Sequence, residues 1–168
     1  MKIKGEDINI FEDLFMLLPV YLLNQVLELK ESQQSPLWHP EGSVYVHTKI
    51  VVERLLPTND INLVIAAIYH DSGKPSTSKI NKHGNICNHG HEAVSAGFVK
   101  RDKAFIEELG GDFDEILGIV INHDRYKDMR KMRKFKQDKM RALPYFKKLV
   151  LFGAADTMVE HEDGLITE

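Results

Sequence analysis

The sequence predicts an all-α fold, and three observations lead to that prediction. Apolar residues recur at spacings of three and four along most of the chain, which is the spacing of one helix face. The apolar–polar alternation typical of strands is nearly absent, and glycine, proline and capping residues separate the periodic segments. No repeat and no long linker divides the chain. We therefore expect one domain over residues 1–168, with residues 1–37 as a helical extension packed on it.

The periodic segments predict a series of helices. They span residues 8–30, 44–56, 60–71, 89–109, 113–123, 136–142 and 145–160. Ser43 is placed to cap the second helix, and Gly73 and Pro75 end the third. The loop 72–88 is expected to form a small hairpin.

Composition limits the class of protein. Hydrophobic residues make up 43% of the chain, which is enough to bury a sizeable core. Cys87 is the only cysteine, so disulfides do not hold the fold together and a reducing compartment fits. The apolar run Leu14–Leu23 is too short to span a bilayer and follows acidic residues. We therefore expect a cytoplasmic protein with no membrane segment and no signal peptide.

Charge is unevenly distributed along the chain. The formal net charge is -3, yet residues 125–148 carry eleven Lys or Arg against Asp128 and Asp138. A basic run of this kind is usually a solvated helix face. Beside a site for phosphate it can instead be an anion-binding surface, and its position after His123 favours that interpretation.

Histidines and aspartates occur on the apolar faces of the predicted helices or at a helix end. These residues are His47, His70, Asp71, His91, His123 and Asp156. A lone histidine on such a face is more often a hydrogen-bonded core residue, and a buried carboxylate needs a partner. One or two shared divalent cations explain the whole set, because imidazole nitrogens and carboxylate oxygens are their ligands. Mn, Co, Ni, Fe and Mg are the candidate ions.

The position of His70 and Asp71 at a helix C-terminus agrees with a metal site. Free carbonyls give that end partial negative charge, which favours a cation. Two ions are the favoured arrangement, with Asp71 as the catalytic bridging carboxylate and a metal-activated hydroxide as nucleophile. If only one ion is bound, His91 and His123 would not be ligands, and on a phosphate-ester substrate they would contact the phosphate or the leaving group instead.

Further residues are candidates for contact with substrate. Lys74 follows the helix end, where its ammonium can contact a phosphate oxygen and so serve both catalysis and substrate binding. The alternative is that Lys74 is a solvated turn residue. His89 is substrate-facing, supports a ligand or is an exposed loop histidine. Arg125 and Lys127 begin the basic run and are expected to bind phosphate. Trp38 lines the mouth of a pocket or belongs to the core.

Taken in order, His47, His70-Asp71 and Asp156 resemble the H…HD…D signature of the HD-domain metal-dependent phosphohydrolases. His91 and His123 match the extra histidines of the two-metal members of that superfamily. The resemblance implies an HD-domain helical bundle with a metal site between helices, and hydrolysis of phosphate esters.

Within the superfamily, three stretches are most similar to the HD domain of bacterial tRNA nucleotidyltransferases and poly(A) polymerase-like proteins. They are "WHPEGSVYVHT", "HDSGKPST" and "HGHEAVSA". The resemblance to the superfamily covers residues 38–163. The finer similarity implies a nucleotide, a 2',3'-cyclic phosphate or another phosphorylated small molecule as substrate, with RNA ends as a further option. The nucleotidyltransferase head itself has no counterpart here.

Two other functions are compatible with the same ligands. The first is an HD-type di-iron oxygenase, although those enzymes resemble one another in a Tyr and a Glu ahead of the first ligand helix that we do not find clearly. The second is a metal-binding regulatory module, which requires a closed site.

Overall fold

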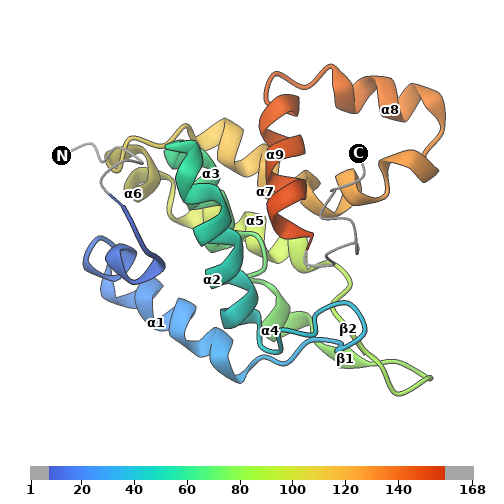
Figure 1. Cartoon of the computed structure of the whole chain (residues 1–168), viewed down its shortest axis with the longest axis horizontal. Coiled ribbons are helices and arrows are strands. Elements are labelled where there is room, and N and C mark those ends of the chain that lie inside the picture. Colours follow the sequence, from blue (N-terminus) through green and yellow to red (C-terminus); the bar gives the residue numbers. More distant parts are fainter. Residues whose placement is uncertain (1–7, 158–168) are drawn as a thin grey trace.

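The computed structural model describes residues 8–157, while residues 1–7 and 158–168 lie outside the described part. Within 8–157 the chain is helical apart from one two-stranded hairpin, which confirms the predicted all-α class (Figure 1). The helices are α1 Val20–Glu28, α2 Val44–Leu55, α3 Ile61–Tyr69, α4 Lys74–Thr77, α5 His91–Arg101, α6 Lys103–Glu108, α7 Phe113–Lys127, α8 Lys134–Arg141 and α9 Phe146–Asp156. Short 3-10 helices cover Phe11–Met16, Leu29–Glu31, Leu56–Thr58 and Met129–Lys131.

Local signals in the sequence explain several of these boundaries. The Ser43 side chain accepts a hydrogen bond from the Val46 N–H and so caps α2, as predicted. The predicted hairpin is also present, because β1 Lys79–Ile80 pairs antiparallel with β2 Ile86–Cys87. No helix within residues 8–157 is long and apolar enough to cross a membrane.

Two predicted helices are wrong as single units. The segment 8–30 is a 3-10 helix followed by α1 and a further 3-10 turn, because Pro19 starts α1 and cannot continue an earlier helix. The segment 89–109 divides at Asp102, which ends α5 and begins α6. Smaller differences are that α7 continues to Lys127, α8 starts at Lys134 and α9 ends at Asp156. Residues 158–160 of the predicted last helix lie outside the described part.

The break at Asp102 has a packing cause. Its buried carboxylate accepts hydrogen bonds from Tyr69 Oη at 2.8 Å, Tyr21 Oη at 3.0 Å and Arg101 Nε at 2.7 Å. Burial alone raises the pKa of the Asp102 carboxyl, but these hydrogen bonds outweigh burial and keep that pKa below its ordinary value. The network joins α1, α3 and the junction of α5 with α6.

The apolar core surrounds α3, where every side chain from Leu63 to Tyr69 is buried. Helices α2, α5, α7 and α9 pack against it, and the described N-terminal elements join the same core. Close packing brings α7 against α9, since a Cβ added to Gly153 would lie 2.3 Å from the Tyr126 ring. Figure 1 shows α8 in orange at the upper right, far from the hairpin at the lower right.

Candidate metal centre

The six predicted ligands converge on one buried point of the fold. His47 comes from α2, His70 and Asp71 from the end of α3, and the other three from α5, α7 and α9. Each of the six is at most 5% exposed. They are His47, His70, Asp71, His91, His123 and Asp156. Ligand atoms lie within 4.8 Å of one another in the group His47, His70 and Asp71 and in the group Asp71, His91 and His123, so each group could hold a metal ion.

Asp71 lies between two groups of histidines. Its Oδ2 is 3.3 Å from His70 Nε2 and 3.5 Å from His47 Nε2. Its Oδ1 is 3.1 Å from His91 Nε2 and 3.7 Å from His123 Nε2. The two oxygens of one carboxylate therefore face different pairs of imidazoles, which is the arrangement that a bridging ligand requires.

Asp156 completes the group formed by His47 and His70. Its Oδ1 is 2.8 Å from His47 Nε2 and 3.5 Å from His70 Nε2. Asp156 is the last residue of α9, so the position of its carboxylate depends on the packing of that helix against α2 and α7.

Each histidine presents Nε2 to the centre because Nδ1 is occupied elsewhere. The Nδ1 atoms of His70, His91 and His123 lie 2.7, 2.9 and 2.7 Å from backbone carbonyl oxygens three residues earlier. A carbonyl can only accept, so Nδ1 carries a proton, and in the neutral imidazole Nε2 is then the atom that presents a lone pair. In His47 the Nδ1 partner is Glu41 Oε1 at 2.7 Å. Such partners orient metal ligands in proteins.

Unpaired polar atoms give an independent test of whether a cation fits. Within the described chain, His70 Nε2, Asp71 Oδ2 and Asp156 Oδ2 are buried without a hydrogen bond. The two carboxylate oxygens do contact ammonium groups, with Lys74 Nζ at 2.7 Å and Lys127 Nζ at 2.6 Å, but not in hydrogen-bonding geometry. Buried groups of this kind need partners, and nitrogen and oxygen donors together suit a divalent transition metal. The residues fit such an ion.

The charges of the cluster also favour a cation. Burial alone raises the pKa of the Asp71 carboxyl, but His70 and Lys74 outweigh it and hold that pKa well below its ordinary value. Burial likewise raises the pKa of the Asp156 carboxyl, but Lys127, His47 and His70 together outweigh burial and hold that pKa well below its ordinary value. Burial lowers the pKa of His70, but Asp71 and Asp156 reverse this effect and raise it to about 10. A metal ion that binds His70 Nε2 would therefore have to displace a proton from that imidazole.

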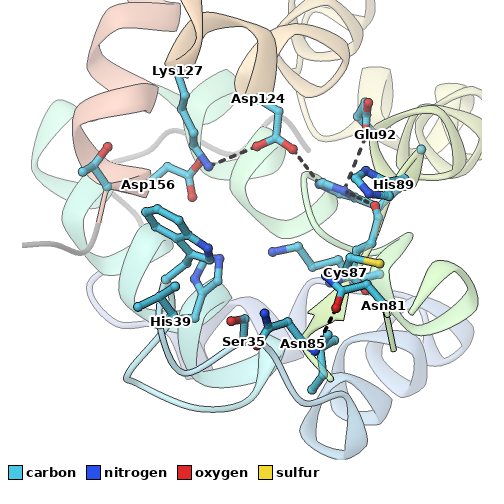
Figure 2. Close-up of a pocket in the computed structure, with 18 residues that line it drawn as sticks. Ser35, His39, Asn81, Asn85, Cys87, His89, Glu92, Asp124, Lys127 and Asp156 are labelled. Atoms are coloured by element: carbon cyan, nitrogen blue, oxygen red, sulfur yellow. Dashed lines mark hydrogen bonds and ion pairs between the residues drawn. The ribbon is translucent and has the colours of Figure 1, made fainter. Parts of the chain in front are cut away.

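A pocket of about 590 Å³ opens from this cluster to the surface. Figure 2 shows Asp124, Lys127 and Asp156 along one side of it, with Ser35 and Asn85 on the opposite side. The cluster therefore has an open side through which a substrate can enter.

The structure brings four of the five predicted contact residues to this pocket. Lys74 lines the wall and is only 6% exposed, so it is not a solvated turn residue. Its ammonium contacts Asp71 and donates a hydrogen bond to Gln34 Oε1 at 2.6 Å. His89 and Lys127 also line the pocket, whereas Arg125 is exposed and lies outside the lining.

Trp38 is the fourth of these residues. Its side chain is 67% exposed and lines the pocket, so the assignment to the core is wrong and the pocket-mouth assignment is confirmed.

Sequence reasoning missed two carboxylates. Asp124 lies 3.5 Å from the Nε2 atoms of both His91 and His123. A repeated His-Asp pair at 123–124, matching the one at 70–71, is the signal that would have found it. Glu41 Oε1 bridges His39 Nδ1 at 3.0 Å and His47 Nδ1 at 2.7 Å, and it belongs to the quoted stretch that precedes the first ligand.

Replacing Glu41 by glutamine is expected to lower metal affinity about 10- to 100-fold. The amide nitrogen of glutamine can donate to His47 Nδ1, which moves the imidazole proton to Nε2 and removes a ligand lone pair. Isothermal titration with Mn²⁺ measures the change. Glu53→Gln on the exposed face of α2 serves as the control, and equal affinities for the two variants would contradict a positioning role for Glu41.

Comparison with known proteins gives one match. A family model described as the HD domain matches residues 39–160, which is most of the chain. No curated protein and no solved structure shows significant similarity to the sequence. The matched range includes all six clustered side chains, so the family match and the geometry concern the same part of the molecule.

Proposed function

The chain belongs to the HD-domain family, and from this premise we propose that it is a metal-dependent phosphohydrolase. The proposed substrate is a nucleotide, a 2',3'-cyclic phosphate or a nucleic-acid end. The observation that carries the proposal is the convergence of six buried imidazole and carboxylate groups, two of which, His91 and Asp156, line an open pocket that also contains two lysines. A hydrolase needs such an open position beside its ligands, whereas a purely structural metal site is closed.

The donor atoms divide into two sets in this proposal. His47, His70, Asp71 and Asp156 would hold one ion, and Asp71, His91 and His123 would hold a second. We favour two ions over one because the two oxygens of the Asp71 carboxylate lie beside different histidines, Oδ2 beside His70 and Oδ1 beside His91. A divalent cation supplies Lewis acidity there, which acidifies water and neutralises phosphoryl charge. With a single ion, His91 and His123 contact the phosphate or the leaving group.

Lysine side chains provide phosphate recognition in the same proposal. Lys74 Nζ is fixed between Asp71 and Gln34 at the pocket wall, so it can donate a charge-assisted hydrogen bond to a phosphoryl oxygen without first being ordered. Lys127 also lines the pocket, and its Nζ contacts Asp124 at 3.1 Å and Asp156 at 2.6 Å. His89 and Arg125 are proposed to contact the substrate further out.

The finer family relationship bears on the choice of substrate. The stretches quoted above support a relationship to the HD domain of tRNA nucleotidyltransferases and poly(A) polymerase-like proteins, and therefore a cyclic phosphate as one test substrate. A nucleoside monophosphate is the second test substrate, because the pocket has room for a whole nucleotide.

Phosphate release under anaerobic conditions tests the proposal against the oxygenase alternative. The chelated protein is reloaded with Mn²⁺ or Co²⁺ and assayed with AMP and with a 2',3'-cyclic phosphate. We expect hydrolysis without oxygen, because a Lewis acid needs no redox change. Rates should fall at high salt if basic residues guide the substrate. An obligatory requirement for iron and dioxygen, with no phosphate released, would overturn the proposal in favour of an oxygenase.

A further inference from the structure

Two large apolar side chains stand exposed at the pocket mouth. Leu37 is 73% exposed and Trp38 is 67% exposed, and both line the pocket. A single exposed apolar residue needs no explanation, but two neighbours at the rim of a concave site mark a binding surface. The indole of Trp38 contributes little to the core and is free to pack against a flat ligand.

Amide side chains of the hairpin region face the same pocket. Asn81, Asn85 and Asn88 all belong to its lining. Among the described residues, Asn88 Oδ1 is buried and has no hydrogen-bond partner. A buried acceptor without a donor is costly in the free protein, and a ligand that brings an N–H group would satisfy it. Figure 2 shows Asn81 and Asn85 across the hollow from Lys127 and Asp156.

We propose that Trp38 and these asparagines form a nucleobase subsite, an inference that rests on the proposed phosphohydrolase function. The base stacks on the indole, and the amides bind the donors and acceptors at its edge. Stacking accepts any base, whereas an asparagine amide can pair with an edge that offers both a donor and an acceptor, as adenine does. The volume of about 590 Å³ lies within the range of sites that hold small ligands and cofactors.

This placement sets the direction of the substrate. The base lies at the outer end beside Trp38, and the phosphate reaches inward to Lys74 and the clustered ligands. The occupant is therefore a phosphate ester that carries a base, as opposed to a simple sugar phosphate.

Intrinsic fluorescence tests the subsite directly, because Trp38 is the only tryptophan of the chain. The full chain, freed of metal by chelation, is titrated with adenosine, with AMP and with ribose 5-phosphate. Excitation at the red edge of the tryptophan band avoids absorption by the bases. We expect adenosine and AMP to quench or shift the emission and ribose 5-phosphate to leave it unchanged. No response to adenosine, or an equal response to ribose 5-phosphate, would overturn the proposal.

Kinetics of variants gives a second test. Trp38→Ala is expected to raise KM for AMP by roughly 5- to 150-fold, with kcat/KM for ribose 5-phosphate unchanged, whereas Trp38→Phe retains most of the affinity. Phe135→Ala removes a comparably exposed aromatic side chain from α8, outside the pocket lining. We expect this variant to leave KM for AMP and kcat/KM for ribose 5-phosphate unchanged. Equal losses on both substrates in Trp38→Ala would contradict a base contact.

The two tests separate this inference from the proposed function. Binding of adenosine without any hydrolysis would retain the subsite and reject the phosphohydrolase. Hydrolysis of AMP and ribose 5-phosphate at the same kcat/KM, with no fluorescence response, would retain the phosphohydrolase and reject the subsite.

Discussion

Replacing Asp71 by alanine is expected to abolish phosphate release and to lower the amount of bound metal. Within residues 8–157, Asp71 is the one carboxylate whose two oxygens face both sets of histidines, so its loss would remove a ligand from each proposed ion. Metal-bound charge stabilisation supplies several kcal/mol to a transition state. The expected fall in kcat is therefore on the order of a thousandfold or more. Metal analysis and phosphate release measure the two effects.

The matched variants are Asp71→Asn and Lys74→Ala. Asparagine keeps the size of the side chain but not its charge, so it separates loss of the ligand from loss of folding. Lys74→Ala should raise KM and leave metal content near that of the parent protein, because Lys74 is proposed to contact phosphate. Circular dichroism checks that each variant folds. Activity of Asp71→Ala close to the parent level would rule out the proposed role of the carboxylate.

Replacing Gly73 by alanine is expected to damage both stability and the site. A Cβ on Gly73 would lie 2.3 Å from the His91 carbonyl oxygen and 2.9 Å from the Ser95 backbone nitrogen. Backbone atoms cannot yield as the end of a flexible side chain does, so α5 has to move away from the end of α3. That movement also strains the hydrogen bond from the Gly73 N–H to Ser95 Oγ at 2.9 Å. We expect the free energy of unfolding to fall by about 1–3 kcal/mol.

The consequence for the site follows from the position of His91. It is the first residue of α5, so displacement of that helix moves its Nε2 away from Asp71 Oδ1 and weakens the second set of ligands. Denaturant unfolding and metal stoichiometry together measure the effect.

Gly97→Ala is the matched control, because Gly97 lies on the exposed side of the same helix and an added Cβ would meet no atom within 4 Å beyond its chain neighbours and the backbone of its own helix. There we expect a gain of about 0.5–1 kcal/mol from the better helix propensity of alanine. A Gly73→Ala variant as stable as the parent protein, with full metal content, would refute the steric argument.

The all-α class and most of the site could be predicted from the sequence alone. Spacings of three and four residues are a local property of the chain, and they place His47 and His123 on the buried faces of their helices whatever those helices pack against. The apolar run before His70 in the same way predicts a core helix that ends at the His-Asp pair. Six candidate ligands could be named for this reason before any contact between helices was known.

Contacts between distant segments could not be read from that periodicity. The division of one predicted helix at Asp102 depends on hydroxyl groups from α1 and α3, which lie 81 and 33 residues away in the chain. Glu41 lies in a loop, so hydrophobic spacing gives no sign of its contact with His47. Asp124 lies on a partly exposed helix face, so the same spacing gives no sign of its contacts with His91 and His123. In the sequence, the one sign of the role of Asp124 is that it directly follows His123, as Asp71 follows His70.

The orientation of the site depends on how the helices cross. Sequence spacing places a side chain on a face, but the distance from Asp71 Oδ1 to His91 and from Oδ2 to His70 depends on the packing of α3 against α5, α7 and α9. The same packing brings Lys127 to Asp156 and leaves Trp38 exposed at the pocket mouth. Each of these contacts joins residues from different elements, and only the relative positions of whole helices and loops in the folded chain determine them.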